Sequence, residues 1–191
     1  MTGIILAGGK SSRMGFNKAF IEVNGVRIIE RTVNLFKEIF NEVMIITNTP
    51  LEYEEFDVRT ATDLIRGAGA LGGIYTGIFH AASSRVFAAA CDMPFLDKDT
   101  ITKMLDMPME GNGIVPFVDS RLHPLHAIYS RNCLKHMENA IKSGDLRITN
   151  LIKKLHIKTV EDIFAAEPAS LSIRNINTIQ ELNALGVTIP A

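Results

Sequence analysis

The chain has 191 residues, of which 47% are apolar and 21% charged, so it is neither disordered nor collagen-like. Its net charge of −1 excludes a global basic field for non-specific nucleic-acid binding. Two cysteines, Cys91 and Cys133, cannot form a disulfide framework, and apolar runs stay well below the roughly 18 residues that span a bilayer. Residues 1–7 lack the basic region of a signal peptide. We therefore expect one cytoplasmic domain over residues 1–191.

Apolar patterns typical of strands and helices alternate along the sequence. In chain order they predict a strand over 2–7, a helix over 27–40, strands over 43–47 and 57–62, a helix over 72–83, a strand over 85–91, a helix over 97–105, strands over 113–118 and 126–130, helices over 132–142 and 146–155, a strand over 157–160 and a helix over 178–185. This alternation predicts an α/β domain with a mostly parallel sheet. Ligands of such sheets bind at the carboxyl ends of strands, here just after Ala7, Thr47, Thr62 and Cys91.

The segment over residues 6–18 is the most informative in the sequence. Gly8 and Gly9 follow the first strand and would let backbone N–H groups approach a ligand closely. Three cations without an anion follow: Lys10, Arg13 and Lys18. Neither the Walker A loop nor the G-x-G-x-x-G dinucleotide pattern fits. The segment is either an anion-binding loop or a basic surface turn.

A carboxylate, Asp92, follows the predicted strand over 85–91, and Pro94 stiffens the turn after it. One carboxylate together with phosphate oxygens is the usual way to hold Mg²⁺. The alternative is that Asp92 only caps or stabilises the turn. Cys91 has no adjacent base, so we do not expect it to be a nucleophile.

Two further segments carry polar groups that could contact a ligand. Asp63 is followed by a glycine-rich stretch over 67–73, interpreted as a loop that folds over a ligand or as a plain surface loop. Asn175 and Asn177 could reach a ligand, although Asn177 could equally cap the last helix. His123 is a further candidate contact, but its spacing to the next histidine does not match zinc sites.

Taken together, these segments resemble the molybdenum cofactor guanylyltransferases (MobA-like) of the nucleotidyltransferase superfamily. The run Leu-Ala-Gly-Gly-Lys-Ser-Ser-Arg-Met-Gly-Phe-Asn-Lys over 6–18 is similar to the superfamily signature, and Cys-Asp-Met-Pro over 91–94 to its metal-binding motif. Asp63, Leu-Gly-Gly over 71–73, His-Pro-Leu over 123–125 and Asn-Ile-Asn-Thr over 175–178 match further landmarks. The resemblance covers nearly the whole chain and implies a three-layer, Rossmann-like nucleotidyltransferase domain.

The resemblance also implies roles for individual residues. The backbone from Leu6 to Gly9, including Ala7 and Gly8, would line the nucleotide and recognise guanine. Lys18 and Arg13 would face the triphosphate and act in catalysis with Asp92, which would hold Mg²⁺. The residues expected to contact the nucleotide or the molybdopterin are Asn48 and Asp63 on the nucleotide side and Asn175 and Asn177 on the molybdopterin side.

The implied substrates are GTP and Mo-molybdopterin, with no nucleic acid or membrane involved. A transient complex with a molybdenum-insertion protein or an acceptor-enzyme chaperone is also implied. The chain departs from the family pattern at Asn17, where the family has Asp, and at Ala70, where it has Pro. We expect the first change to alter the orientation of Lys18, and the second to make the glycine-rich loop more mobile.

Three alternatives stay open on the sequence. The nearest is a cytidylyltransferase acting on molybdopterin or on a sugar or polyol phosphate. Leu-Ala-Gly-Gly in place of Leu-Ala-Ala-Gly favours guanine, on the argument that Gly9 lacks a Cβ and leaves room for a purine. The second is a different guanylyl acceptor, such as a sugar phosphate or a corrinoid precursor. The third is a catalytically silent nucleotide- or partner-binding module, against which Lys18 and Asp92 argue.

Overall fold

The computed structural model describes residues 1–8, 17–176 and 181. Its strands are β1 (Thr2–Leu6), β2 (Glu22–Val23), β3 (Val26–Arg27), β4 (Glu42–Ile46), β5 (Arg59–Ala61), β6 (Arg85–Ala90), β7 (Gly113–Val118), β8 (Arg121–Leu122), β9 (His126–Ser130) and β10 (Ile157–Val160). Its α-helices are α1 (Ile28–Ile39), α2 (Gly69–His80), α3 (Lys98–Asp106), α4 (Cys133–Lys142), α5 (Ile148–Lys154) and α6 (Ala169–Ser172). Three short 3₁₀ helices complete the described elements: η2 (Lys18–Phe20), η3 (Pro50–Phe56) and η4 (Asp162–Phe164).

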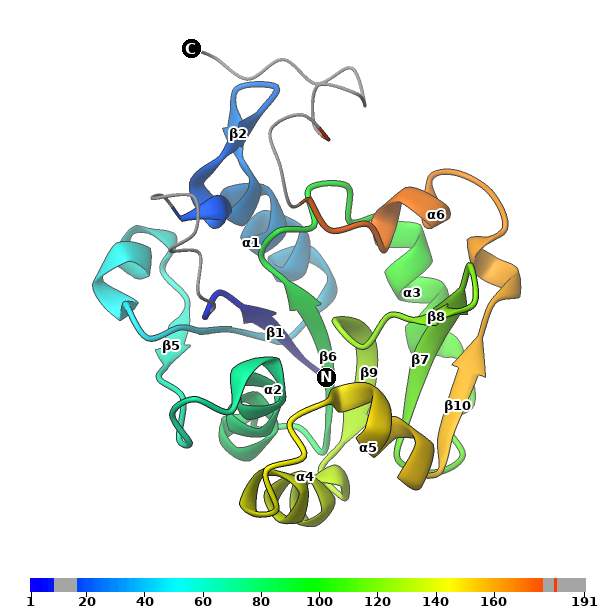
Figure 1. Cartoon of the computed structure of the whole chain (residues 1–191). Helices are drawn as coiled ribbons and strands as arrows, with labels where there is room; N and C mark the ends of the chain where they lie inside the picture. Colours follow the sequence, from blue (N-terminus) through cyan, green and yellow to red (C-terminus); the bar gives the residue numbers. More distant parts are fainter. Residues whose placement is uncertain (9–16, 177–180, 182–191) are drawn as a thin grey trace.

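The main sheet has the strand order β10-β7-β9-β6-β1-β4-β5, and β8 pairs with β7 (Figure 1). Strand β1 runs parallel to both of its neighbours, with Leu6 opposite Ile46 on β4 and Ala90 on β6. Strand β9 is antiparallel to β6 and β7, which reverses the chain direction near one side. The prediction of an α/β fold with a mostly parallel sheet is confirmed.

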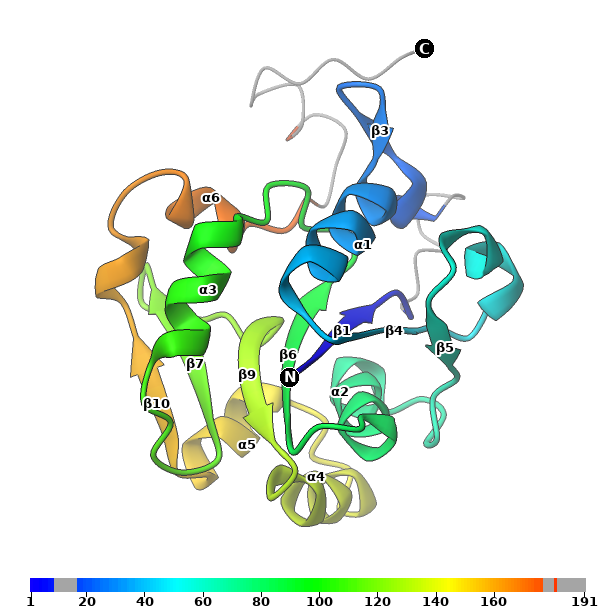
Figure 2. The ribbon, with the colours of Figure 1, turned by 180° about the vertical axis from the view of Figure 1, so that it is seen from behind.

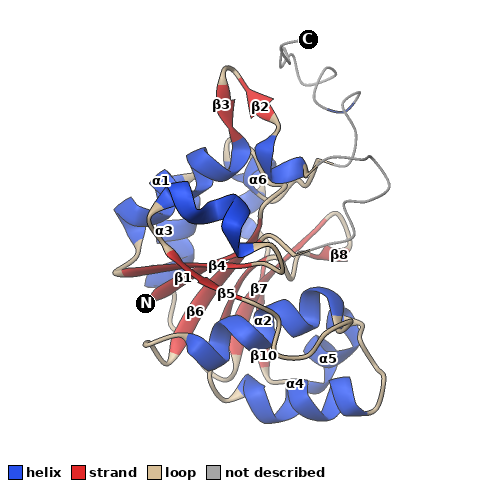
Figure 3. Ribbon diagram, turned by 90° about the vertical axis from the view of Figure 1, so that its left-hand side faces the viewer, coloured by secondary structure: helices blue, strands red, loops and turns tan. Residues whose placement is uncertain are grey.

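Helices cover both faces of the sheet, with α1 and α3 on one side and α2, α4 and α5 on the other (Figures 2 and 3). Residues along β1 alternate between the two cores. Ile5 belongs to the cluster that includes Phe36 of α1, whereas Ile4 belongs to the cluster that includes Ile74 of α2. All of β1 is buried, which explains why its sequence after Thr2 is continuously apolar instead of alternating.

Two glycines of helix α2, Gly73 and Gly77, face strand β1. A Cβ on Gly77 would lie 2.5 Å from Cδ1 of Ile4, and a Cβ on Gly73 would lie 3.2 Å from Cδ2 of Leu6. An alanine at Gly77 would therefore force the buried side chain of Ile4 to move, whereas an alanine at Gly73 would require Leu6 to shift by a few tenths of an ångström. No helix in the described part of the chain is long and apolar enough to cross a lipid bilayer.

The predicted elements agree with the structure in type, and most of their ends agree within two residues. The helix expected over 72–83 instead begins at Gly69, so the interpretation of the whole stretch 67–73 as a loop was wrong. The β2–β3 hairpin and the 3₁₀ helices were not predicted, because each is too short to show a periodic pattern. The helix predicted over 178–185 lies outside the described residues except for Glu181.

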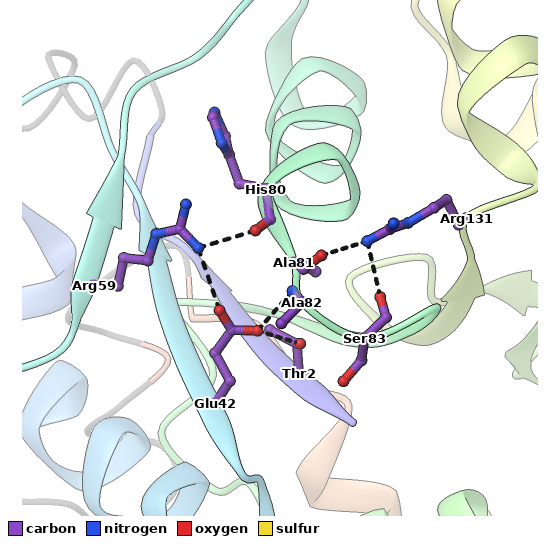
Figure 4. Close-up of polar contacts among 8 residues, drawn as sticks. All are labelled: Thr2, Glu42, Arg59, His80, Ala81, Ala82, Ser83 and Arg131. Carbon is purple, nitrogen blue, oxygen red and sulfur yellow. Dashed lines mark hydrogen bonds and ion pairs between the residues drawn. The ribbon is translucent and has the colours of Figure 1, made fainter.

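At the edge where β1 and β4 begin, one carboxylate joins three segments (Figure 4). Oε2 of Glu42 accepts hydrogen bonds from the Thr2 hydroxyl at 2.6 Å and from the Ala82 backbone N–H at 2.9 Å. Oε1 of Glu42 accepts from Nη1 of Arg59 at 3.3 Å, and the same nitrogen donates to the His80 carbonyl at 3.0 Å. Glu42 thus ties strand β1, strand β5 and the end of α2 together.

We expect Glu42→Gln to lower the free energy of unfolding by about 1–3 kcal/mol at pH 7, because hydrogen bonds to a charged carboxylate are lost. Burial raises the pKa of Glu42, but the hydrogen bonds from Thr2, Ala82 and Arg59 outweigh it and lower the pKa overall. The stabilisation is therefore present above the ordinary pKa of 4.5 and lost as the pH falls through the lowered folded pKa. Denaturant unfolding at several pH values measures this.

The exposed Glu110→Gln variant is the matched control and should change the unfolding free energy by less than about 0.5 kcal/mol. An effect of Glu42→Gln as small as that of the control, or one that grows at acidic pH, would contradict the assigned role of Glu42.

Candidate active site

A cavity of about 240 Å³ opens at the carboxyl ends of the strands. Its lining comes from the ends of β1, β4 and β6, from the loop after β5, and from four other segments. The lining residues are Leu6, Ala7, Gly8, Lys18, Ile46, Asp63, Ala70, Gly73, Ala90, Cys91, Asp92, Leu125 and Asn175. The structure therefore brings together most of the residues singled out from the sequence, at the sheet edge where ligands of α/β folds bind.

One wall of the cavity is formed after β4 and β5. Nδ2 of Asn48 donates to Oδ2 of Asp63 at 2.8 Å, which fixes both side chains at the mouth. A Cβ on Gly8 would lie 3.7 Å from Nδ2 of Asn48 and 3.8 Å from Oδ2 of Asp63. Asn48, two residues after the end of β4, does not line the cavity itself but holds the lining residue Asp63.

Gly8, not Gly9, is the glycine that could leave room for a purine. Leu-Ala-Gly-Gly and Leu-Ala-Ala-Gly differ at Gly8, whereas Gly9 is the same in both and lies outside the described residues. The space that an alanine methyl group would occupy faces Asn48 and Asp63. Gly8 therefore leaves this part of the cavity open.

The opposite wall is built around Asp92. The backbone N–H of Cys91 donates to the Leu6 carbonyl at 3.1 Å and extends the pairing of β6 with β1 up to the cavity. Oδ1 of Asp92 then accepts from Nδ2 of Asn175 at 3.0 Å, and the Asp92 carbonyl accepts from the Ile176 N–H at 2.9 Å. The turn that carries Asp92 is thus held by the C-terminal segment.

Lys18 completes the cluster from a third direction. Its Nζ donates to the Ile176 carbonyl at 3.5 Å, so residues 175 and 176 contact both Lys18 and Asp92. Burial raises the pKa of Asp92, and the positive charge of Lys18 opposes this shift without cancelling it. A half-buried carboxylate beside an ammonium group is an arrangement suited to binding a charged ligand.

Asp92 bonds to residues 175 and 176 and so stabilises its own turn, as the alternative interpretation expects. It does not cap α3, because the N-cap of that helix is Asp97. Oδ2 of Asp97 accepts from the backbone N–H of Thr100 at 2.8 Å and from its hydroxyl at 2.6 Å.

Burial raises the pKa of the Cys91 thiol to about 12, and the neighbouring Asp92 adds to the shift. Cys91 is therefore a neutral thiol at physiological pH, in agreement with the expectation that it is no nucleophile.

The C-terminal segment reaches the cavity because α6 is fixed to the core. The ring of His126 is fully buried and its Nε2 shares a hydrogen bond of 2.9 Å with Oγ of Ser172. The same hydroxyl oxygen accepts from the Asp97 backbone N–H at 3.0 Å. Phe87 and Phe164 flank the imidazole edge-to-face, with ring centroids 5.0 and 5.8 Å away. These contacts hold the chain in place three residues before Asn175.

Burial lowers the pKa of His126 from its ordinary 6.5 to about 4. His126 takes up a proton at higher pH in the unfolded chain than in the folded protein. The contribution of its neutral ring to the free energy of unfolding is therefore fully present above pH 6.5 and is lost as the pH falls towards 4. The loss over this window should be of the order of 3 kcal/mol. His126→Gln, which keeps the hydrogen bond at the position of Nε2 without titrating, should flatten the pH dependence of the unfolding free energy.

Denaturant unfolding between pH 7 and pH 4 measures this slope, and the exposed His136→Gln variant on α4 is the control. If the control flattens the curve as much as His126→Gln does, the slope does not come from the buried histidine.

Several sequence predictions need correction or lie outside the described residues. Gly69 to Gly73 form the first turns of α2 instead of a loop, and Ala70 lines the cavity from the helix. Nε2 of His123 lies 3.4 Å from the Val118 carbonyl, and His123 does not line the cavity. The proposed positions outside the described residues are Gly9, Arg13 and Asn177.

Ile46 and Ala90 line the cavity without having been singled out from the sequence. Four further lining residues lie in segments that were singled out but were not named as individual contacts: Ala70, Gly73, Cys91 and Leu125. Most of them are small or apolar and carry no chemical signal in the sequence. Leu125 lies at the cavity because its carbonyl accepts a hydrogen bond from the Ala90 N–H at 3.1 Å. This contact joins the residue before β9 to the end of β6, and it follows from the order of the strands in the sheet, which the sequence alone does not show.

The donor set suits a magnesium ion bound together with a substrate. Within residues 1–8, 17–176 and 181 there is no group of three or more His, Cys, Asp or Glu side chains that could enclose a metal alone. Asp92 supplies one carboxylate at the cavity, and Mg²⁺ typically combines one or two carboxylates with phosphate oxygens and water. The residues present therefore fit a metal that arrives with a phosphorylated ligand.

Comparisons with known proteins agree with this geometry. The family model of the MobA-like NTP transferase domain matches residues 3–160. A molybdenum cofactor guanylyltransferase of Desulfosudis oleivorans is 37% identical over 196 residues, covering 100% of this chain and 96% of the relative. A crystal structure of a protein from Aquifex aeolicus superposes with a TM-score of 0.79 at 30% identity and 93% coverage of both chains.

The structure of molybdopterin-guanine dinucleotide biosynthesis protein A from Archaeoglobus fulgidus shares the fold, with a TM-score of 0.79 at 22% identity and 96% coverage of both chains. The family match over residues 3–160 includes the strands of the main sheet and the cavity residues from Leu6 to Leu125. The chain therefore belongs to the MobA-like NTP transferase family.

Proposed function

We propose that this nucleotidyltransferase moves GMP from GTP to the terminal phosphate of Mo-molybdopterin. The observation that carries the proposal is the cavity at the strand ends, where Lys18, Asp63 and Asp92 face one space. Asn48 holds Asp63 by a hydrogen bond. The names of full-length relatives, such as the guanylyltransferase of Desulfosudis oleivorans, support this nucleotide and this pathway. The reaction would take place in the cytoplasm, as expected from the sequence.

In the proposed step, an oxygen of the acceptor phosphate attacks the α-phosphorus of GTP. A new bond forms between that oxygen and the α-phosphorus. The bond between the α-phosphorus and the oxygen that bridges it to the β-phosphate breaks, and pyrophosphate leaves with the electron pair. No covalent intermediate with the protein is needed, so the protein acts by positioning and by neutralising charge.

The ammonium group of Lys18 would offset the negative charge that develops on the α-phosphate and the leaving group, and Arg13 would act with it. Asp92 would hold Mg²⁺, which when bound supplies polarisation of the phosphate oxygens. The hydrogen bond from Asn175 to Oδ1 of Asp92 would keep that carboxylate oriented towards the cavity. The same segment would carry Asn175 and Asn177 to the molybdopterin side.

Guanine recognition would fall to the wall formed by Leu6, Ala7, Gly8 and Asp63, with Asn48 holding Asp63 from behind that wall. Guanine presents two neighbouring donors, N1–H and N2–H₂, and the carboxylate of Asp63 offers matching acceptor oxygens. The missing Cβ of Gly8 leaves the space beside Asp63 open for the larger ring system. The alternative is a cytidylyltransferase, which would use the same phosphate-binding residues.

Calorimetry with GTP, CTP, ATP and UTP in the presence of Mg²⁺ tests this proposal. We expect selective binding of GTP that is weakened in Lys18→Ala and unchanged in Lys103→Ala, an exposed lysine on α3. A preference for CTP would overturn the guanylyl assignment while leaving the mechanism intact. Absence of nucleotide binding, even with molybdopterin supplied, would favour the silent binding module.

A further inference from the structure

The side chain of Asn17 uses every hydrogen-bonding hydrogen it has. Its Nδ2 donates to Oε2 of Glu52 at 2.8 Å and to the hydroxyl oxygen of Tyr53 at 2.8 Å. Its Oδ1 accepts from the backbone N–H of Ala19 at 3.1 Å, which caps η2. One amide thus connects the turn that begins at Lys18 with η3, and the bond to Glu52 spans 35 residues of the chain.

The chemistry of these partners fixes the orientation of the amide. The Ala19 N–H can only donate, whereas an ionised Glu52 can only accept. Reversing the amide would place two donors together at Ala19 and two acceptors together at Glu52. An aspartate at position 17 would keep the cap but would oppose the Glu52 carboxylate directly, because it has no hydrogen to donate.

Asn17 matters for the site because Lys18 follows it directly. Lys18 opens η2, and the backbone N–H of Phe20 donates to the Asn17 carbonyl at 3.0 Å. At the other end of the turn, the ring of Phe20 packs 5.3 Å from the ring of buried Tyr53. Lys18 is therefore held on both sides by η3, while its side chain lines the cavity.

Helix η3 is itself fixed to the hairpin beside it. Nη1 and Nη2 of Arg27 donate to the two carboxylate oxygens of Glu55, each at 2.7 Å. The guanidinium of Arg27 also lies over the rings of Phe20 and Phe56, at 5.8 and 5.1 Å. The element that receives the Asn17 side chain is thus held by contacts that do not involve residue 17.

We propose that Asn17 is a positioning residue for Lys18, and that the carboxylate of Glu52 requires an amide, not a second carboxylate, at position 17. The inference rests on the proposed function, since it assumes that Lys18 faces the reacting phosphates. Residues 17 and 52 form a matched pair: an amide opposite a carboxylate, or a carboxylate opposite an amide, completes the connection to η3. Two carboxylates do not.

The test measures kcat and KM from Mg²⁺- and molybdopterin-dependent pyrophosphate release, well below the melting temperature of every variant. Asn17→Asp should lower kcat by about tenfold, because small displacements of a catalytic group are costly, with little change in melting temperature. Adding Glu52→Gln should restore most of the loss, since the new amide at position 52 can donate to the new carboxylate at position 17. The kcat of the double variant N17D/E52Q is compared with the kcat of E52Q alone.

Glu54→Gln is the matched control, because Glu54 is an exposed acid on the same element that does not hydrogen bond to Asn17 in the described structure. Wild-type kcat in N17D, no restoration by E52Q, or equal restoration by E54Q would each overturn the inference. A wild-type protein that releases no pyrophosphate would instead contradict the proposed function, and the role of Asn17 would fall with it. The two failures are distinguishable because only the second affects the wild type.

Discussion

Lys18→Ala should lower turnover by about 100-fold or more, comparable to the removal of a donor that stabilises an oxyanion. Nζ of Lys18 lies at the cavity, 3.5 Å from the Ile176 carbonyl and close enough to Asp92 to influence the pKa of that carboxyl. An alanine would leave the charge developing on the α-phosphate without this ammonium group. Steady-state pyrophosphate release with saturating GTP, Mg²⁺ and molybdopterin measures the effect.

Lys103→Ala, an exposed lysine on α3, controls for the loss of one positive charge and should keep wild-type turnover. Lys18→Arg separates charge from geometry, since its larger planar group keeps the charge but not the compact ammonium. Near-wild-type turnover in a folded Lys18→Ala protein would remove Lys18 from the mechanism.

Asp92→Asn should lower the metal-supported rate by about 100-fold or more, because Mg²⁺ supplies several kcal/mol of transition-state stabilisation. The substitution keeps the size of the side chain, and its oxygen can still accept from Asn175. The turn, also held by the Ile176 N–H, should therefore stay in place. The measurement is a Mg²⁺ titration of activity together with the melting temperature.

Asp99→Asn provides the matched control, since Asp99 is an exposed carboxylate in the first turn of α3. The control should show wild-type rates and an unchanged Mg²⁺ requirement. If Asp92→Asn responds to Mg²⁺ as the wild type does, Asp92 is not the metal ligand.

Much of the fold could be predicted because its central strands are buried on both faces. The run over Thr2–Leu6 is apolar in nearly every position, and such runs are typical of the middle of a parallel sheet. Amphipathic helices such as α1 carry an equally clear period. The start of α2 was missed because Gly67 and Gly69 stand before and at it, and glycine normally disfavours helices. Gly73 and Gly77, inside the predicted helix, serve close packing on β1.

The site could be predicted where chemistry and strand ends coincide. Asp63 and Asp92 follow strands and carry charge, so their position at the cavity was expected. The contacts that hold them were not foreseeable, because they join distant parts of the chain. The bond from Asn175 to Asp92 spans 83 residues and that from Lys18 to Ile176 spans 158. The pairing of Asn17 with Glu52 depends likewise on where η3 lies in the fold.

Transfer of GMP is tested most directly by incubating the protein with Mg²⁺, Mo-molybdopterin and GTP labelled at the α-phosphate, and separating the products. We expect the label in a guanine dinucleotide form of the cofactor, with one pyrophosphate released for each transfer. CTP in place of GTP should give little product. A known guanylyltransferase assayed in parallel serves as the positive control. Transfer from CTP alone would contradict the proposed GMP transfer, and so would label that stays in GTP while the control enzyme forms product.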